Sequence, residues 1–311
     1  MTWDSKTVLV TGGTGYLGQY LCKYLEGKCH KIIAFGRDPH KHEQMQRDMP
    51  YVRPFVGDVR DQQRLTMAME EADLCVHAAA MKSVPMCEYN PADAHSINVQ
   101  GTLNVLNAAR KFSVPTVFIS TDKAVEPVNL YGKTKALAEH ITLAYNSYGS
   151  LFSVVRYGNV MGSAGSVLPY WRSLPEGEPI PITNTDCTRF WVDLEDAVEL
   201  IEKAFEKPGQ LVVGRFPAFN IYDLAVVVSD GRAWKANGLR KGEKKHETLI
   251  GENEGPAYTS LNAEWRLDQE ELRERIHSLY EARPGDGRRR ESRGERFTVL
   301  TPYSWPENGG V

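Results

Sequence analysis

Four side chains suited to acid–base chemistry lie close together between residues 120 and 135. Asp122 carries a carboxyl group, Lys123 an amine and Tyr131 a phenol. Tyr131 and Lys135 are four residues apart, so they share one face if the segment is a helix. A lysine ammonium beside a tyrosine favours the phenolate, which lowers the tyrosine pKa and makes the phenol a usable base near neutral pH. These residues therefore predict a site of proton transfer.

A buried strand and a helix must position these side chains. The apolar residues 114–119 predict a parallel strand whose carboxyl end delivers Thr121, Asp122 and Lys123. A helix is expected from about Tyr131 to residue 148. Ligands of open α/β sheets bind at the carboxyl ends of the strands. On its own, Tyr-x-x-x-Lys is common by chance and a surface strand–loop–helix would look similar. Its position after a buried strand and a glycine fingerprint favours an active site.

The glycine fingerprint lies near the start of the chain. Residues 7–11 predict a buried strand, Gly12, Gly15 and Gly18 follow, and a helix is expected to about residue 25. Such glycines allow a tight turn and a close approach to a pyrophosphate, which meets the helix N-terminus. The strand before and the helix after favour a dinucleotide site over a plain glycine-rich turn. The cofactor-binding residues predicted here are Gly12, Thr14, Gly15, Tyr16 and Leu17.

The end of the next strand, residues 31–35, bears on the choice of cofactor. Arg37 comes first and suits a 2′-phosphate, whereas an acidic residue such as Asp38 would suit a ribose 2′-hydroxyl. This order favours NADP. If Arg37 only stacks on the adenine, NAD remains the alternative.

Further cofactor contacts are expected from later segments. Residues 54–59 predict a third strand with Asp58 at its tip, facing the adenine amino group. Residues 73–80 predict a fourth strand whose small last residues let the backbone approach the cofactor, with His77 packed inside. Residues 82–90 are expected to be a loop lining the cleft, and residues 93–111 a helix. Asn98 either turns toward the site or is an ordinary polar helix residue. The predicted cofactor-binding residues are Asp58, Val59, Ala78, Ala79, Ala80, Lys82 and Asn98, in addition to Arg37, Tyr131 and Lys135.

The alternation of strands and helices predicts an α/β fold, a Rossmann-type doubly wound parallel sheet with a smaller C-terminal lobe. Residues 1–160 are expected to form the Rossmann domain, with residues 188–215 packing back on it. Residues 161–187 and 216–311 are assigned to the lobe. Asp193 is a plausible N-cap of a helix to residue 206, and residues 265–280 predict another helix. Residues 283–296 are rich in Gly and Arg, and residues 298–311 show no pattern that assigns them.

Composition narrows the class of protein. The chain has 311 residues, 41% of them hydrophobic, a net charge of −3 and a pI near 6.3, so it offers no general basic field to nucleic acid. Its five cysteines include no C-x-x-C pair, which argues against a disulfide framework or a zinc site. No apolar run is long enough to span a membrane. We expect a soluble, cytoplasmic protein without a metal.

Taken together, the motifs resemble the extended short-chain dehydrogenases/reductases. More narrowly, they resemble the inverting, CapD-like UDP-N-acetylglucosamine 4,6-dehydratases of polysaccharide biosynthesis. Asp122 and Lys123 lie only nine and eight positions before Tyr131, and retaining sugar dehydratases carry a Glu where Lys123 stands. Lys241 departs from the pattern, which usually has a Pro there. The matching segments are residues 11–15, 57–61, 77–80, 88–91, 120–124, 129–135, 156–160, 165–167, 188–191 and 242–247.

The resemblance implies a reaction. Tyr131 would take the proton of the sugar C4 hydroxyl while hydride leaves C4 for the nicotinamide. Lys123 would remove the C5 proton, and Asp122 would protonate the departing C6 hydroxyl. Hydride would then return to C6, and a proton arriving on the opposite face would invert C5. Lys135 would hold the nicotinamide ribose and tune Tyr131. Because a lysine base must be neutral, burial or nearby cations should lower the Lys123 pKa.

The resemblance also implies a nucleotide-sugar substrate, a substrate-binding C-terminal lobe and a homo-oligomer. Arg189 and Arg240 would neutralise phosphates and Glu243 would meet a ribose hydroxyl, although composition alone suggests a solvent-facing charge cluster for the last two. The remaining alternatives are a C4 or C5 epimerase, the same dehydration on another carrier such as a GDP-sugar, and a cofactor-sensing regulator, which would not need all four acid–base residues. The predicted substrate-binding residues are Lys82, Thr121, Asn159, Ser166, Val167, Arg189, Arg240 and Glu243.

Overall fold

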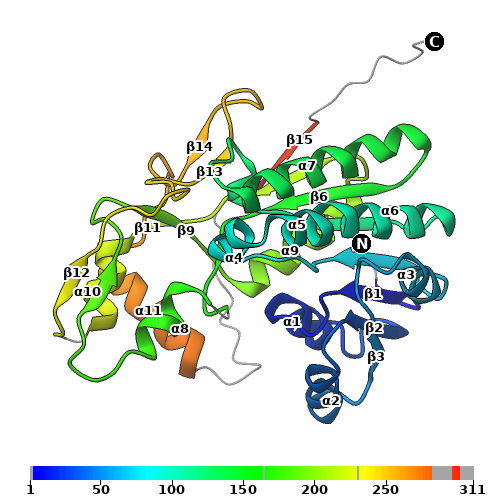
Figure 1. Cartoon of the computed structure of the whole chain (residues 1–311), viewed down its shortest axis with the longest axis horizontal. Coiled ribbons are helices and arrows are strands. Elements are labelled where there is room, and N and C mark those ends of the chain that lie inside the picture. Colours follow the sequence, from blue (N-terminus) through cyan, green and yellow to red (C-terminus); the bar gives the residue numbers. More distant parts are fainter. Residues whose placement is uncertain (1–2, 164, 230, 282–295, 302–311) are drawn as a thin grey trace.

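A computed structural model describes residues 3–163, 165–229, 231–281 and 296–301. Its main feature is an eight-stranded sheet with the order β15-β10-β6-β5-β4-β1-β2-β3 (Figure 1). All neighbouring strands are parallel except β15, which pairs antiparallel with β10. The strands are β1 (Thr7–Thr11), β2 (Lys31–Gly36), β3 (Val52–Val56), β4 (Leu74–His77), β5 (Thr116–Ile119), β6 (Phe152–Arg156), β10 (Leu211–Gly214) and β15 (Phe297–Leu300).

The order of the strands reverses between β1 and β4, which are direct neighbours. In doubly wound sheets this switch point is where ligands bind, outside the carboxyl ends of the strands. The glycine fingerprint follows β1, and residues 78–80 follow β4. The predicted Rossmann-type α/β fold is confirmed.

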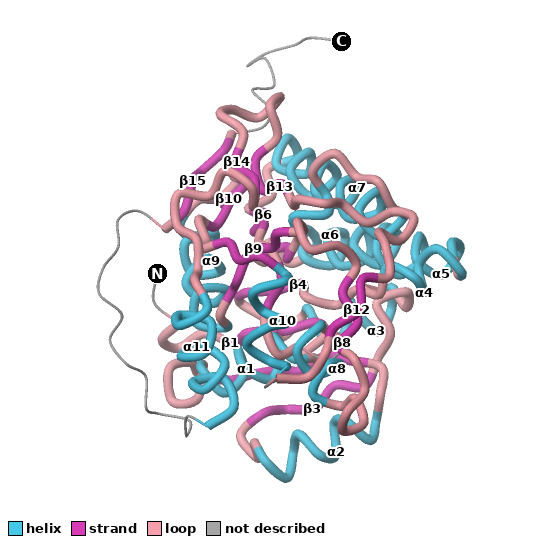
Figure 2. Tube along the Cα trace, turned by 90° about the vertical axis from the view of Figure 1, so that its left-hand side faces the viewer, coloured by secondary structure: helices cyan, strands magenta, loops and turns pink. Residues whose placement is uncertain are grey.

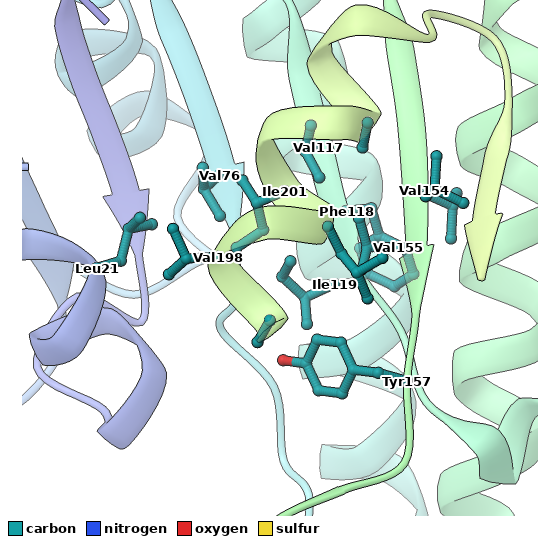
Figure 3. Packing of buried hydrophobic residues seen from close by; sticks show 14 of the residues in the cluster. Leu21, Val76, Val117, Phe118, Ile119, Val154, Val155, Tyr157, Val198 and Ile201 are labelled. Atoms are coloured by element: carbon teal, nitrogen blue, oxygen red, sulfur yellow. The ribbon is translucent and has the colours of Figure 1, made fainter. Parts of the chain in front are cut away.

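Alternating side chains of the inner strands supply two cores. In β1, Val8 and Val10 pack in one cluster with Leu21, whereas Leu9 packs in another with Leu65 and Val105. This alternation follows from the two-residue period of a strand. Figure 3 shows the first cluster, with Leu21 and residues of α9 against the strands. The first cluster contains residues of the helices α1 (Tyr16–Tyr24), α2 (Pro39–Asp48) and α9 (Leu194–Glu206). The second cluster contains residues of α3 (Gln62–Met69) and α6 (Gly101–Lys111), and α7 (Leu130–Ala144) packs beside α6.

Among the described residues, three short sheets lie apart from the main sheet, and the one formed by β13 (Thr248–Ile250) and β14 (Tyr258–Thr259) packs on the main core. The other two sheets and three helices form a smaller lobe, seen at the left of Figure 1 and facing the viewer in Figure 2. Its core holds Trp171, Trp191, Leu224 and Leu272, which come from separate parts of the chain. The strands of the lobe are β7 (Asn159–Val160), β9 (Thr188–Val192) and β11 (Ala218–Asn220), then β8 (Ile180–Ile182) with β12 (Trp234–Ala236). The helices are α8 (Val167–Arg172), α10 (Ile221–Ser229) and α11 (Gln269–Glu281).

Several predicted boundaries were wrong. The predicted loop at residues 82–90 contains α4 (Val84–Tyr89), because Ser83 caps the helix and Pro85 fits its first turn. The helix expected from residue 93 already begins as α5 (Pro91–His95) and continues through a π-helical segment into α6. The third strand ends before Asp58, and α11 begins four residues later than predicted.

The end of the chain differs from the prediction as well. We expected residues 216–311 to belong to the lobe, but β15 joins the edge of the main sheet. Residues 282–295 and 302–311 of the predicted tail lie outside the described residues. Across the described part of the chain, every helix is too short or too polar to cross a membrane.

Candidate active site

The predicted acid–base residues come together where β5 meets α7. A short 3-10 helix (Asp122–Ala124) follows β5, and α7 begins after Asn129, whose side chain accepts a hydrogen bond from the Gly132 N–H at 2.8 Å. A Cβ on Gly132 would lie 2.1 Å from the carbonyl oxygen of Lys123. The glycine therefore lets the 3-10 helix lie directly against the first turn of α7.

Lys123 lies at the centre of this arrangement. Its Nζ donates to Asp122 Oδ1 at 2.9 Å, and it is 3.5 Å from both Asn159 Oδ1 and Glu247 Oε1. Burial alone would lower the pKa of Lys123, but Asp122 and Glu247 outweigh it and raise the pKa. The prediction of a lowered pKa was therefore wrong, because Asp122 and, to a smaller extent, Glu247, which the sequence argument did not include, outweigh burial.

Asp122 is fully buried. Its Oδ1 accepts from Lys123 and, at 3.0 Å, from Thr121 Oγ1. Its Oδ2 has no hydrogen-bond partner among the described residues. Burial raises the pKa of Asp122, Glu247 adds to the rise, and Lys123 opposes it. A carboxyl group with a raised pKa suits the role of an acid.

Tyr131 is buried in the first turn of α7. Burial raises its pKa to about 12, while Lys123 and a hydrogen bond to Thr121 act in the opposite direction. We expected Lys135 to lower this pKa. The prediction was wrong in two respects, because Lys123 is the lysine that acts on Tyr131 and because burial has the larger effect.

Lys135 shares the face of α7 with Tyr131 but bonds elsewhere. Its Nζ donates to the Ile119 carbonyl at 2.6 Å and lies 3.9 Å from the centre of the Phe118 ring. Burial lowers the pKa of Lys135 to about 7, with Glu139 opposing the shift. The amine is thus held at the end of β5, next to the acid–base residues.

The glycine fingerprint brings two chain segments close together. Gly12 has φ +69°, and a Cβ on it would lie 2.9 Å from the Ala79 backbone nitrogen. Helix α1 begins after Gly15 without a side-chain cap, so its first N–H groups face the predicted phosphate site. This geometry fits a dinucleotide. Thr14 is buried there, Leu17 packs on the core, and Ala78 and Ala80 flank Ala79.

Tyr16, predicted to bind the cofactor, connects the fingerprint to the smaller lobe. Its hydroxyl donates to the Met161 carbonyl at 3.2 Å. Val59 packs against Gly101 with its side chain, so only its backbone is left for a ligand. Asp58 forms an ion pair with Arg60, with Oδ2 2.8 Å from Nη2. The hydrogen bond from Arg60 is the main cause that lowers the pKa of Asp58.

The two candidates for recognising the adenosine ribose differ in their surroundings. The Asp38 carboxylate caps α2, accepting from the N–H groups of His40 at 3.0 Å and Lys41 at 3.2 Å. Arg37 is exposed at the end of β2. Asp38 is thus engaged in its own helix, whereas Arg37 is accessible.

Asn98 turns inward, one of the two outcomes left open by the sequence. Its amide accepts from the Met81 N–H at 2.8 Å and donates to the Met81 carbonyl and to Thr134 Oγ1, each at 3.0 Å. Asn98 therefore anchors the segment after β4 to α7. Lys82, which follows Met81 in the chain, is exposed beside this anchor.

The predicted phosphate and ribose contacts form one cluster. Arg189 Nη2 lies 3.1 Å from Glu243 Oε1, which also accepts from Thr183 Oγ1 at 3.2 Å. The Arg240 N–H donates to Glu243 Oε2 at 3.3 Å, while its side chain is exposed. Glu243 is thus half-buried and paired rather than part of a solvated charge cluster. Ser166 and Val167 stand apart, at the start of α8.

Glu247 is the site residue that sequence reasoning did not assign. It is 3% exposed and lies near Lys123 and Arg189. The same segment is fixed to the loop between β5 and α7 by hydrogen bonds from the Asn129 side chain to the Gly242 carbonyl at 2.8 Å and from Lys244 Nζ to the Val125 carbonyl at 2.5 Å. The matching motif at residues 242–247 was the available signal, but its charged composition suggested a solvated loop.

Comparisons with known proteins agree with this geometry. The chain is 41% identical over 265 residues to an inverting UDP-N-acetylglucosamine 4,6-dehydratase of Campylobacter jejuni, covering 81% of this chain and 79% of the relative. It is 38% identical over 281 residues to a UDP-glucose 4-epimerase of Rickettsia canadensis, covering 84% and 82%. The solved structure of Pen from Bacillus thuringiensis matches with a TM-score of 0.84 at 31% identity, over 90% of this chain and 99% of that chain.

A family model extends over most of the fold. Residues 8–268, from β1 to the segment before α11, match the model described as polysaccharide biosynthesis protein. The match includes the glycine fingerprint, the acid–base residues and the segment that carries Glu243 and Glu247. The chain belongs to the polysaccharide biosynthesis protein family.

Proposed function

We propose that the chain is a nucleotide-sugar 4,6-dehydratase that acts on UDP-N-acetylglucosamine and inverts C5 of the sugar. The reaction oxidises C4 by loss of hydride and eliminates water across C5 and C6. The hydride then returns to C6 while a proton adds to the opposite face of C5, which leaves a 4-keto-6-deoxy sugar with C5 inverted. The identity to the Campylobacter jejuni dehydratase supports both the substrate and the stereochemistry.

The buried pair of Asp122 and Lys123 carries the proposal. Elimination needs an acid at the departing hydroxyl and a base at the neighbouring carbon, whereas a C4 epimerase needs only the base that acts in the oxidation. Lys123 Nζ lies 2.9 Å from Asp122 Oδ1. Lys123 lowers the pKa of Tyr131 and Asp122 raises it, so both groups influence this phenol. This arrangement favours dehydration over epimerisation.

The cofactor is NADP in this proposal. Arg37 is exposed at the end of β2, where a guanidinium suits a 2′-phosphate, and Asp38 is engaged as a helix cap. When bound, the nicotinamide would supply the hydride acceptor and later the hydride donor, so that no net oxidation would occur. Lys135 positions the nicotinamide ribose, and the backbone at Gly12 and Ala79 holds the diphosphate.

The side chains act in a defined order. Tyr131 accepts the proton of the C4 hydroxyl as C4 is oxidised to a ketone. The ketone then makes the proton on C5 acidic. Lys123 removes the C5 proton, and Asp122 protonates the C6 oxygen as the C–O bond breaks. Because Lys123 rests as an ammonium ion, it must lose its proton before it can act as the base.

The smaller lobe binds the nucleotide. Arg189 and Arg240 neutralise the diphosphate of the nucleotide sugar, and Glu243 binds a hydroxyl of its ribose. Lys82 and Thr121 face the sugar from the Rossmann side, Asn159 faces it from β7, and Ser166 and Val167 contact the sugar or base at the start of α8. We further propose that the enzyme is a cytoplasmic homo-oligomer.

Proton NMR of the reaction in deuterated water tests the proposal. Purified protein with NADP and UDP-N-acetylglucosamine should give a 6-deoxy methyl signal and deuterium at C5, with coupling constants of the inverted configuration. Tyr131→Phe should give neither change. A new nucleotide sugar without a methyl signal would identify an epimerase, and an unchanged substrate would contradict the proposed specificity.

A further inference from the structure

The carboxylate of Glu247 approaches the catalytic pair from the segment before β13. Its Oε1 lies 3.5 Å from Lys123 Nζ and 3.8 Å from Arg189 Nε. The residue is held by its backbone, since its N–H donates to Ser260 Oγ at 2.9 Å and its carbonyl accepts from the Ser260 N–H at 2.8 Å. None of the proposed reaction steps uses this buried carboxylate.

Two buried carboxyl groups therefore share one lysine. Asp122 lies 2.9 Å from Lys123 on one side, and Glu247 lies 3.5 Å away on the other. If both were ionised, Lys123 could neutralise only one of them, and Arg189 beside Glu247 is already paired more closely with Glu243. A buried charge that is not fully compensated is strongly disfavoured. Paired carboxyl groups resolve such a conflict when one of them holds a proton.

The surroundings decide which carboxyl group is protonated. Two cations from other elements lie near the Glu247 carboxylate: Lys123, which follows β5, and Arg189, which lies in β9. Lys244, in the same segment as Glu247, also lowers its pKa. Asp122 has only Lys123 as a cationic partner within 4 Å among the described residues. These cations lower the pKa of Glu247 although burial raises it, whereas burial and Glu247 raise the pKa of Asp122. The greater number of cations around Glu247 favours Glu247 as the anion and Asp122 as the group that holds the proton.

We infer that Glu247 is a positioning residue for the dehydration, the counter-ion of Lys123 that leaves the Asp122 carboxyl group free to hold the proton given to the departing hydroxyl. The unpartnered Oδ2 of Asp122 is the atom available to carry this proton. In the step itself the Asp122 O–H bond breaks, a new O–H bond forms on the C6 oxygen, and the C6–O bond breaks to release water. The inference rests on the proposed function.

The pH profile of kcat tests this role. Glu247→Gln keeps the shape of the side chain but removes its charge, which lowers the pKa values of both Asp122 and Lys123. The optimum should move to lower pH by about 1 unit. At the wild-type optimum, kcat should fall by up to about 10-fold because a larger fraction of the acid is ionised. An optimum equal to that of the wild type would overturn the inference.

Two variants separate charge from structure. Ser260→Ala removes the side-chain anchor of the Glu247 backbone but leaves the carboxylate, so the optimum should stay in place. Glu247→Asp keeps the charge and should restore the wild-type optimum at a reduced rate. A shift of the same size in Ser260→Ala would show that Glu247 acts only through the local structure and would overturn the inference.

A measurement without substrate keeps the test independent of folding and of the proposed function. Infrared spectra of the wild-type protein near neutral pH should contain the carbonyl band of a buried protonated carboxyl group, and Asp122→Asn should lack it. Absence of that band in the wild type would overturn the inference even if dehydration occurs. Lack of any methyl product by NMR would instead contradict the proposed function and leave the infrared result to decide the protonation of Asp122.

Discussion

Arg156 and Glu139 form a buried ion pair between β6 and α7, with Nη2 2.6 Å from Oε2 and Nε 3.1 Å from Oε1. Arg156 also pairs with Glu254 at 2.7 Å and donates to the Leu249 carbonyl at 2.9 Å. One guanidinium thus joins the main sheet, the helix that carries Tyr131 and the segment after β13. Such a fork of donors fixes the relative orientation of the three elements.

We predict that Glu139→Ala destabilises the protein strongly. The substitution removes the hydrogen bonds between Glu139 and Arg156, whereas Glu254 still compensates the guanidinium charge. The free energy of unfolding should therefore fall by about 1.5–3 kcal/mol. Urea denaturation followed by circular dichroism measures this change. Lys203→Ala is the control, because its exposed pair with Glu206 should contribute at most about 1 kcal/mol. Equal effects of the two substitutions would contradict the structural role of Arg156.

We predict that Tyr131→Phe abolishes most turnover without unfolding the protein. Loss of the base that acts on the C4 hydroxyl should lower kcat by about 10²–10⁴-fold. Steady-state kinetics and a thermal unfolding curve provide the two measurements. Tyr148→Phe, at an exposed tyrosine beyond α7, should leave both unchanged. Full activity in Tyr131→Phe would exclude the proposed role.

We predict that Lys135 makes the stability of the ligand-free protein depend on pH. Burial lowers its pKa from the ordinary value of 10.5 to about 7, so between these values the unfolded chain binds more protons than the folded one. The free energy of unfolding should therefore rise with pH across this window. The slope from Lys135 is about 1.4 kcal/mol per pH unit.

Lys135→Met provides the comparison for this slope. The variant should lack the rise that the wild type shows between pH 7 and 9. Chemical denaturation at several pH values measures both proteins, and the other titrating groups cancel in the difference. Parallel curves would show that Lys135 titrates normally.

We predict that Arg37 selects the cofactor. Arg37→Ala should weaken NADP binding at least about tenfold, since a charge-assisted contact to the 2′-phosphate contributes about 1.5–3 kcal/mol. The affinity for NAD should change little. Isothermal titration calorimetry with both cofactors measures the ratio.

Asp38→Ala is the matched control for this measurement. It removes the cap of α2 and should lower stability by about 1 kcal/mol, but it should keep the preference for NADP. If Asp38→Ala changed the cofactor ratio and Arg37→Ala did not, the assignment of NADP would be wrong.

Local sequence signals predicted much of the fold. The strand at residues 7–11 agrees with β1, and Asp193 is the N-cap of α9. The apolar runs and caps act within a few residues, so neighbouring sequence is enough to specify them. The helix at residues 84–89 was missed because Pro85 and Pro91 resemble loop signals, although proline also fits the first turn of a helix.

The electrostatics of the site could not be predicted in the same way. The charge of Lys123 depends on Glu247, which is distant in sequence and becomes a neighbour only through the tertiary fold. Similarly, the spacing of Tyr131 and Lys135 placed both on one face of α7 but did not show that Lys135 bonds to Ile119. Contacts of this kind depend on long-range packing, which a motif does not contain.

The antiparallel strand β15 has a consequence for solubility. An unpaired outer edge on β10 would present free N–H and C=O groups, to which a strand of another molecule could add. Pairing with β15 occupies that edge. At the opposite end of the sheet, β3 carries Pro54, which has no N–H to donate. The outermost strands are thus β3, which is interrupted by a proline, and the four-residue β15, and short or proline-containing edge strands are poor templates for aggregation. A chain cut before residue 296 should expose the edge of β10 instead.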